Sequence, residues 1–317
     1  MEELVVVVLL NYNQNEYTIN CIKSLIKSDY KNFKILLIDN GSTHDNVKEL
    51  EMDLPNCERL IFKKLIKNIG YPAGSNYGFK EALKLNPKYF LIMNNDTIID
   101  KYAIMELVKT CEDYNNKARV TGKVYHYNKP NVLQIIGNKF LNKSMLLYET
   151  MGADELDIGQ YDRVKEREMI DDIFVLQPAE LYKKIGGYST YFWMNGVEKD
   201  LSLRAIKQKF KLVYTPHAKL WHKGSVSLGG RDMNPKIAFW HMQSKLILRF
   251  LHLNKLNFLI FYFKTLISIT RTFIKSIYLR LFKGKDIINY AKAKYKGLIY
   301  FNKWLINKNE NNGMTPY

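Results

Sequence analysis

The chain has 317 residues, of which 48 are lysine or arginine and 31 are aspartate or glutamate, so its formal net charge is +17. Hydrophobic residues make up 47% and aromatic residues 13%, which excludes general disorder, and the length suits one large domain or a domain with an appendage. Three cysteines without a CxxC pair argue against a disulfide framework and fit a reducing cytoplasm.

The positive charge is concentrated in the C-terminal part. Residues 236–317 contain 15 lysines and arginines but only two acidic residues, so this tail has a net charge of +13 and the first 235 residues only +4. We therefore expect a globular domain over residues 1–235 and a basic tail over residues 236–317. The acidic opening of the chain and the short apolar run behind it do not fit a signal peptide.

The first hundred residues alternate between strand and helix patterns. Short, continuous apolar runs predict buried strands at residues 4–10, 33–38, 58–62 and 89–93. Helices are predicted at residues 16–28 and 76–85, with a polar helix between the second and third strands. This alternation is typical of an α/β fold with right-handed crossovers around a mostly parallel sheet.

The following segment is less regular. Residues 118–176 show short strand patterns with a polar loop at 152–169, then helices at 178–185 and 197–210. A strand at 211–214 is expected to end before Pro216.

The tail combines apolar and basic residues. Its apolar run at 256–269 is too short to span a bilayer and contains Lys264. Lys264, Ser268, Arg271 and Lys275 form one polar stripe along an otherwise apolar helix. This pattern indicates a helix in the interface of an anionic membrane. The alternatives are a helix packed on the domain with its lysines in water, and a true span.

Polar clusters follow three of the four predicted strands, at residues 11–13, 39–42 and 94–96. Because ligands of such sheets bind at the carboxyl ends of the strands, this edge is the expected binding site. Asp96 could ligate Mg²⁺ or Mn²⁺ together with phosphate oxygens, or it could cap a helix. Asp39-Asn40-Gly41-Ser42 could hold a ribose or base, or form a plain turn.

The segment from Asn68 to Gly78 is rich in glycine but matches neither GxGxxG nor a Walker loop. It could bring the backbone and a helix N-terminus close to an anion, or it could be a structural turn.

Two carboxylates stand at the start of the helix predicted at 197–210. Glu198 and Asp200 diverge by about 200° on a helix, so only one can face a given cleft, and the other can cap the helix or pair with Arg204. Nearby aromatic residues would raise the pKa of a carboxyl group, which suits a general base. His222, predicted in a loop, could make a second metal or phosphate contact, although a lone histidine is usually structural.

Seven segments in order resemble the inverting glycosyltransferases of family 2, in the rhamnosyltransferase-like subgroup. They are Asn11-Tyr12-Asn13, Asp39-Asn40-Gly41-Ser42, the segment from Asn68 to Gly78, Asn94-Asn95-Asp96-Thr97, Gly186-Gly187-Tyr188, the helix from Glu198 to Arg204, and His222-Lys223-Gly224-Ser225. The resemblance covers roughly residues 4–230. It implies a GT-A type, Rossmann-like nucleotide-diphospho-sugar transferase fold, extended by the basic amphipathic helical tail.

The resemblance also implies roles for single residues. Asp39 would hold the nucleoside, Asp96 a divalent metal, and Glu198 would deprotonate the acceptor hydroxyl, with Asp200 as the alternative base. The remaining expected donor-binding residues are Asn11, Asn13, Asn68, Gly74, Asn76 and Asn95. His222 is the expected second metal ligand, and Trp193 and Asn195 are expected at the acceptor.

Three positions depart from the family pattern. Asn94 replaces the first aspartate of the DxD-like motif, Val197-Glu198 replaces a Glu-Asp pair, and Tyr188-Ser189 replaces Phe-Asp. The last two changes affect the expected acceptor geometry.

The sequence therefore predicts a metal-dependent hexosyl- or rhamnosyltransferase that uses a UDP- or dTDP-linked sugar. We expect it on the cytoplasmic face of the cell membrane, acting on a glycan or lipid-linked acceptor in surface polysaccharide or glycolipid synthesis. One alternative is a basic nucleic-acid-binding protein, supported by charge alone, since no nucleic-acid-binding motif is present. Another is a catalytically silent scaffold of a synthesis complex.

Overall fold

The computed structural model describes residues 2–224 and 234–308, which divide into two compact units. The first comprises residues 2–139, 149–188 and 198–224, and the second comprises residues 140–148, 189–197 and 234–308. In the structure, two short segments of the predicted first domain thus group with the tail.

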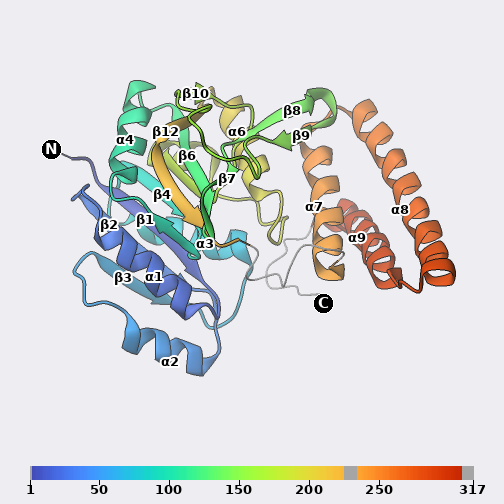
Figure 1. Cartoon of the computed structure of the whole chain (residues 1–317), viewed down its shortest axis with the longest axis horizontal. Coiled ribbons are helices and arrows are strands. Elements are labelled where there is room, and N and C mark those ends of the chain that lie inside the picture. Colours follow the sequence, from blue (N-terminus) through green and yellow to red (C-terminus); the bar gives the residue numbers. More distant parts are fainter. Residues whose placement is uncertain (1, 225–233, 309–317) are drawn as a thin grey trace. The chain divides into compact units, whose positions relative to one another are not determined.

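The first unit is built on a ten-stranded sheet (Figure 1). Its main path runs β10 (Lys165–Glu166), β12 (Lys211–His222), β6 (Ala118–His126), β11 (Phe174–Pro178), β4 (Tyr89–Met93), β1 (Val5–Asn11), β2 (Phe33–Asp39) and β3 (Leu60–Lys64). The four strands β4, β1, β2 and β3 are mutually parallel, whereas β11 is antiparallel to both of its neighbours. The predicted α/β fold is confirmed.

Four further strands complete the β-structure of the described residues. β5 (Thr97–Ile99) pairs with β12, and β7 (Lys129–Ile135) pairs with β6. β8 (Asn138–Asn142) and β9 (Leu147–Thr150) form a separate two-stranded sheet.

Helices cover both faces of the large sheet. α1 (Asn15–Ile26), α2 (His44–Asp53) and α4 (Ala103–Asp113) share one apolar core with alternate residues of the strands, such as Val5 and Val7. α3 (Tyr71–Leu83), α5 (Ala179–Ile185) and α6 (Val197–Lys207) belong to the other face, where Phe79 contacts Phe90 and Tyr182. Both faces of β4, β1 and β2 are therefore buried, as their apolar sequences predict, whereas the edge strand β3 is partly exposed.

Two predicted boundaries are wrong. α3 begins at Tyr71, so the segment expected as a loop as far as residue 78 is helical after Gly70. Gly70 has a φ of +88°, which suits glycine, and Pro72 lies in the first turn, where no backbone N–H is needed. β12 also continues through Pro216 to His222, with a register shift between Tyr214 and Lys219.

The glycines of α3 allow it to approach the sheet closely. A Cβ atom on Gly74 would lie 2.9 Å from Leu10 Cδ1, and one on Gly78 would lie 2.6 Å from Val8 Cγ1. Larger side chains would push α3 away from β1.

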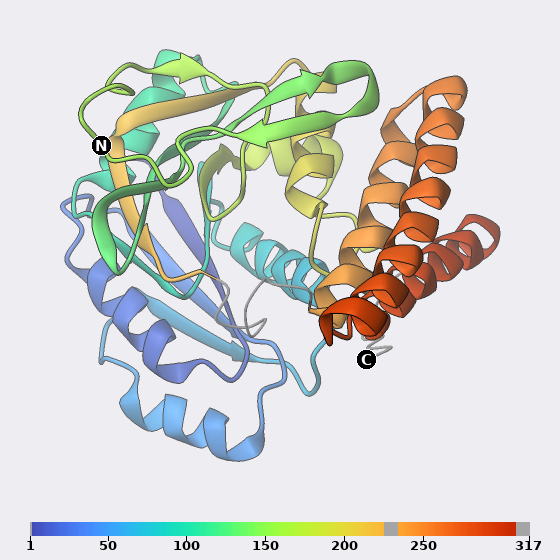
Figure 2. The same cartoon turned by 45° about the vertical axis from the view of Figure 1, so that its right-hand side comes forward.

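Three α-helices lie in the described part of the second unit, coloured orange to red in Figure 2. They are α7 (Pro235–His252), α8 (Lys255–Lys283) and α9 (Ile288–Asn307). Arg249 of α7 binds the short helix η1 (Lys143–Met145) and its C-cap by donating to the carbonyl oxygens of Met145 (3.1 Å) and Leu146 (2.7 Å). None of the helices in the described ranges combines the length and apolar character needed to cross a membrane.

We predict that Gly78→Ala lowers the free energy of unfolding by about 1–3 kcal/mol, because the added methyl group overlaps Val8 and outweighs the better helix propensity of alanine. Urea denaturation measures the change. Lys80→Ala, at an exposed position of the same helix, is the control and should change stability by less than about 0.5 kcal/mol. A Gly78→Ala protein that is more stable than the parent would contradict the packing argument.

Candidate active site

The polar ends of β1 and β2 meet around a buried carboxylate. Asn11 and Asp39 are the last register pair of these strands, and both side chains are fully buried. Asp39 accepts hydrogen bonds from Asn11 Nδ2 (2.9 Å), the Ser42 backbone N–H (2.8 Å) and Ser42 Oγ (2.6 Å). These three donors compensate for removing the carboxylate from water.

Thr18 on α1 and Asn95 after β4 extend this network. Thr18 Oγ1 donates to Asn11 Oδ1 (2.8 Å), and Asn95 Nδ2 donates to Thr18 Oγ1 (2.8 Å). The network thus joins the ends of β1, β2 and β4 at one sheet edge. The nucleoside contact predicted for Asp39 stays a prediction, and it requires the Ser42 hydroxyl to turn away from the carboxylate.

Asn13 holds the loop after β1 against the loop after β2. It has a φ of +53°, in the left-handed region that asparagine tolerates. Its backbone N–H donates to Ser42 Oγ (2.8 Å), and its Oδ1 accepts from the Thr43 N–H (3.0 Å) and Asn46 Nδ2 (3.2 Å). The side chain is exposed at the same edge as Asp39.

Asn68 and Asn40 organise the turn into α3. Asn68 Oδ1 accepts from the Gly70 N–H (2.8 Å) and from Asn40 Nδ2 (3.2 Å), while Asn40 Oδ1 accepts from the Ile69 N–H (3.2 Å). The N-terminus of α3, with its partial positive charge, therefore starts beside the end of β2. This arrangement suits an anionic ligand at the edge.

Two residues predicted to bind the donor have structural tasks. Gly74 is required by the close packing of α3 on β1. Asn76 uses both amide atoms on the Tyr188 backbone, donating to its oxygen and accepting from its N–H at 2.8 Å each. A Cβ on Gly187 would lie 2.0 Å from Asn76 Oδ1, which explains the glycine before Tyr188. Beside these structural tasks, the donor contacts expected of Gly74 and Asn76 stay predictions.

Asp96 and His222 come together from segments far apart in the chain. His222 is the last residue of β12 and not part of a loop as predicted, and its Nε2 lies 3.2 Å from Asp96 Oδ1. His222 Nδ1 contacts Gln134 Oε1 at 2.6 Å, and Asn94 Nδ2 approaches Nε2 at 3.3 Å. With both ring nitrogens protonated, Nδ1–H donates to Gln134 and Nε2–H donates to Asp96, and removal of the Nε2 proton leaves a lone pair facing the Asp96 carboxylate.

The electrostatic environment keeps Asp96 ionised. Burial opposes this, but the hydrogen bond and charge of His222, with backbone N–H groups of Asp96 and Gly224, hold the pKa of Asp96 below its usual value. The Asp96 carboxylate oxygen and the His222 ring nitrogen are close enough to bind the same divalent cation. Within residues 2–224 and 234–308, no group of three or more His, Cys, Asp or Glu side chains could hold a metal. Two protein ligands leave positions for substrate oxygens.

Glu198 has the properties of a general base. Its side chain, at the start of α6, is partly exposed. Burial, together with the carboxylates of Asp171 and Asp172, raises the pKa of Glu198 to about 7. The positive charge of Lys199 acts in the opposite direction. Tyr71, in the first turn of α3, is close enough to Glu198 for that carboxylate to help raise the pKa of the phenol. Tyr71 follows the Asn68 turn, so Glu198 lies near the N-terminus of α3.

Asp200 has a different role. It is buried, and Arg204 Nε donates to its Oδ2 at 2.8 Å. The same guanidinium binds the carbonyl oxygens of Ile185 (2.8 Å) and Gly187 (2.7 Å). Of the two carboxylates that the sequence leaves open, Asp200 forms the predicted pair with Arg204, and Glu198 remains as the candidate base.

The sequence did not predict a buried polar cluster that lies near Glu198. Arg119 donates to Asp172 Oδ1 (2.7 Å), Gln177 Oε1 (2.9 Å) and Ser202 Oγ (2.8 Å), and Tyr188 Oη donates to Asp172 Oδ2 (2.6 Å). These hydrogen bonds link β6, β11 and α6 near Glu198, the candidate base. A polar residue within a predicted apolar strand, such as Arg119, is the only signal that pointed to it.

The residues expected at the acceptor lie in the second unit. Trp193 is only 6% exposed and stacks on Trp240, with ring centroids 5.4 Å apart, so it packs within the second unit, and its acceptor contact stays a prediction. Asn195 is partly exposed, and its acceptor contact stays a prediction.

We predict that Arg204→Met lowers the free energy of unfolding by about 3–5 kcal/mol, because it removes the guanidinium that is ion-paired with the buried Asp200 carboxylate. Adding Asp200→Leu should recover part of this loss. Lys183→Met, at an exposed position, serves as the control. Equal denaturation midpoints for Arg204→Met and the parent would show that the pair is not structural.

Solved structures support the fold. A mannosyltransferase of Pyrobaculum calidifontis, solved with GDP-Man and Mn²⁺, superposes with a TM-score of 0.55 at 12% identity, covering 98% of this chain and 89% of that one. GalNAc-T7, solved with UDP, GalNAc and Mn²⁺, gives a TM-score of 0.58 at 14% identity, covering 69% and 44%. The predicted GT-A type fold is confirmed.

Sequence relatives agree with the structures. A poly-beta-1,6-N-acetyl-D-glucosamine synthase of Staphylococcus epidermidis is 24% identical over 295 residues, covering 92% of this chain and 68% of the synthase. The glycosyltransferase GlyG of Streptococcus pneumoniae is 24% identical over 160 residues, and the match spans 50% of this chain and 52% of GlyG. The sequence profile of glycosyl transferase family 2 matches residues 6–172, so the chain belongs to glycosyl transferase family 2.

Proposed function

We propose that this protein transfers a sugar, with inversion, from a nucleotide-diphosphate sugar to a hydroxyl group of a glycan or lipid-linked acceptor. Family membership supports sugar transfer, and the polymer named for the Staphylococcus relative supports a role in surface polysaccharide synthesis. The observation that carries the proposal is the partly exposed Glu198, with its pKa raised to about 7, close to Tyr71 at the N-terminus of α3, which starts beside the end of β2.

Glu198 would act on the acceptor. Its carboxylate accepts the proton of the acceptor hydroxyl while that oxygen attacks the anomeric carbon from the side opposite the diphosphate. The new glycosidic bond forms as the bond to the diphosphate oxygen breaks, so a single displacement inverts the anomeric configuration. A base with a pKa near 7 suits this reaction at neutral pH.

Asp96 and His222 would hold a divalent cation, Mg²⁺ or Mn²⁺, which when bound offsets negative charge on the diphosphate. The Mn²⁺ in structures that share this fold supports the assignment. The donor would be a UDP- or dTDP-linked hexose or rhamnose, with its anionic part near the N-terminus of α3. The basic tail would place the protein on the cytoplasmic face of the membrane.

Replacing the base tests the proposal. Glu198→Gln should lower kcat by about a hundredfold to ten-thousandfold while donor binding persists, because the amide cannot accept the proton. Donor binding is measured by thermal shift with nucleotide sugars and Mn²⁺, and turnover by release of the nucleotide. Glu180→Gln, an exposed carboxylate on α5, is the matched control and should keep full turnover. Full turnover of Glu198→Gln would refute Glu198 as the base.

The pH dependence follows from the same group. The reactive form is the carboxylate, and its pKa is raised to about 7, so turnover should fall as the pH drops through about 7. Below that point kcat should decrease about tenfold per pH unit. A profile that stays flat down to pH values near the usual glutamate pKa of about 4.3 would contradict this assignment.

A further inference from the structure

Helix α8 is apolar on two opposite sides, but only one of them is packed. The inner side carries Phe258, Thr265, Ile269 and Ser276. There Phe258 contacts Phe301 of α9, with ring centroids 5.9 Å apart. The opposite side is exposed over the whole length of the helix. It includes Leu256 (67% exposed), Leu259, Phe263 (60%), Ile267, Ile274 (63%) and Leu281 (70%). An exposed apolar surface of this extent on one helix indicates an interaction site.

Basic side chains flank this exposed side. At 3.6 residues per turn, Lys264, Arg271 and Lys275 fall along one border of it, and Lys255 and Arg280 fall near the other. All six charged residues of α8 are lysine or arginine. An apolar face bordered by long cationic side chains is the pattern of a helix that lies in a lipid interface, with its ammonium and guanidinium groups among the headgroups.

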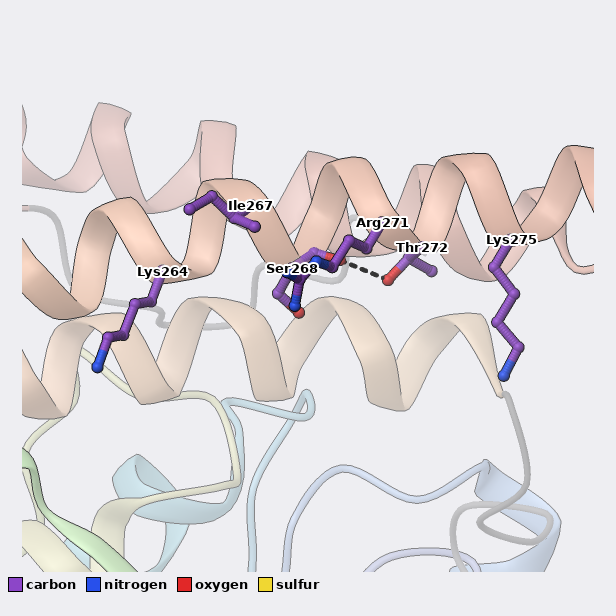
Figure 3. Close-up of a pocket in the computed structure, with 6 residues that line it drawn as sticks. All are labelled: Lys264, Ile267, Ser268, Arg271, Thr272 and Lys275. Atoms are coloured by element: carbon purple, nitrogen blue, oxygen red, sulfur yellow. Dashed lines mark hydrogen bonds between the residues drawn. The ribbon is translucent and has the colours of Figure 1, made fainter.

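One of these borders forms a groove. It has a volume of about 560 Å³, and its lining residues, all on α8, are shown in Figure 3: Lys264, Ile267, Ser268, Arg271, Thr272 and Lys275. Lys264 and Lys275 extend from the same side of the helix (Figure 3). Lys294 of α9 adds a fourth cation by donating to Thr272 Oγ1 at 2.8 Å. In the described part of the chain, no carboxylate forms an ion pair with any of these four cations.

The charge around the groove is not neutralised by α7 or α9 either. Lys245 of α7 has its pKa lowered to about 8 by burial and by the nearby charges of Lys294 and Arg249. Asp286 is the only acidic residue within residues 234–308, and it lies in the exposed turn after α8. The surface therefore needs an anionic partner, and a second copy of the same helix would bring like charges together.

We propose that the exposed face of α8 docks on an anionic phospholipid bilayer, with its apolar side chains among the acyl chains and lipid phosphates in the groove from Lys264 to Lys275. This inference deepens the proposed function, and rests on it, by assigning membrane contact to one face of one helix. The phosphate groups provide the missing negative charge, and the acyl chains cover apolar side chains that nothing in the described unit covers.

The test measures sedimentation of the full chain with protein-free vesicles. Binding to vesicles that contain phosphatidylglycerol should be strong, and binding to phosphatidylcholine alone weak. Replacing both Ile267 and Ile274 by Gln should weaken binding by more than about tenfold, since two apolar side chains lose their lipid contacts. Met52→Gln with Ile66→Gln makes the same change at two exposed apolar positions of the first unit and should leave binding unchanged.

A charge variant tests the groove. Replacing Lys264 and Lys275 by Gln should weaken binding to phosphatidylglycerol vesicles by at least about tenfold, since each lysine near an anionic surface contributes about fivefold. Lys48→Gln with Lys80→Gln, at exposed positions of the first unit, is the charge-matched control. Circular dichroism checks that every variant is folded.

Donor binding without vesicles separates this inference from the proposed function. The α8 variants should keep the thermal shift with nucleotide sugar, because none of their positions belongs to the candidate active site. A chain that binds donor but ignores protein-free vesicles, or binds only membranes that retain their proteins, would overturn the docking inference alone. Equal binding by the parent and the Ile267 and Ile274 variant would also overturn it.

Discussion

The hydrogen bond between Asn11 and Asp39 is the constraint on which the site depends. It joins the last register pair of β1 and β2, and the carboxylate it satisfies is fully buried. A buried carboxylate is tolerated only with full hydrogen bonding, so the turn after β2 must supply Ser42 as a donor. The other end of the Asn11 amide accepts from Thr18, which in turn orders Asn95 after β4. The hydrogen-bond network around the buried Asp39 carboxylate thereby joins the ends of β1, β2 and β4. Asp96 follows Asn95 at the same edge.

The roles proposed for Asp200, Asp96 and Glu198 differ because the surroundings of these residues differ. Asp200 is neutralised by Arg204 and stabilises α6. Asp96 has a histidine and backbone donors beside it, which keep it anionic and suited to a cation. Burial, helped by the nearby carboxylates of Asp171 and Asp172, raises the pKa of Glu198, so its carboxylate can take up a proton near neutral pH. Environment, and not residue type, assigns the three roles.

The sequence alone predicted the parallel strands and the polar clusters at their ends, and it offered a pair with Arg204 as one option for the carboxylate that does not face the cleft, because these follow from local periodicity. It did not predict the contact of His222 with Gln134 or the cluster around Arg119, since both depend on strand pairings between distant segments. The glycines after Asn68 were interpreted as a loop, although they serve helix packing against Val8 and Leu10. On α8, the basic stripe was visible in the sequence, but the exposed apolar face became evident only once α9 was seen to cover the opposite side.

The most direct test of a single nucleotide-diphosphate site at this edge is a crystal structure of the protein grown with UDP and Mn²⁺, with anomalous diffraction used to locate the metal. The account predicts an anomalous peak within coordination distance of the Asp96 carboxylate and His222 Nε2, with the diphosphate on that ion and the nucleoside beside the Asn11–Asp39 network. A peak at other side chains, or a nucleotide bound away from the carboxyl ends of β1, β2 and β4, would contradict it.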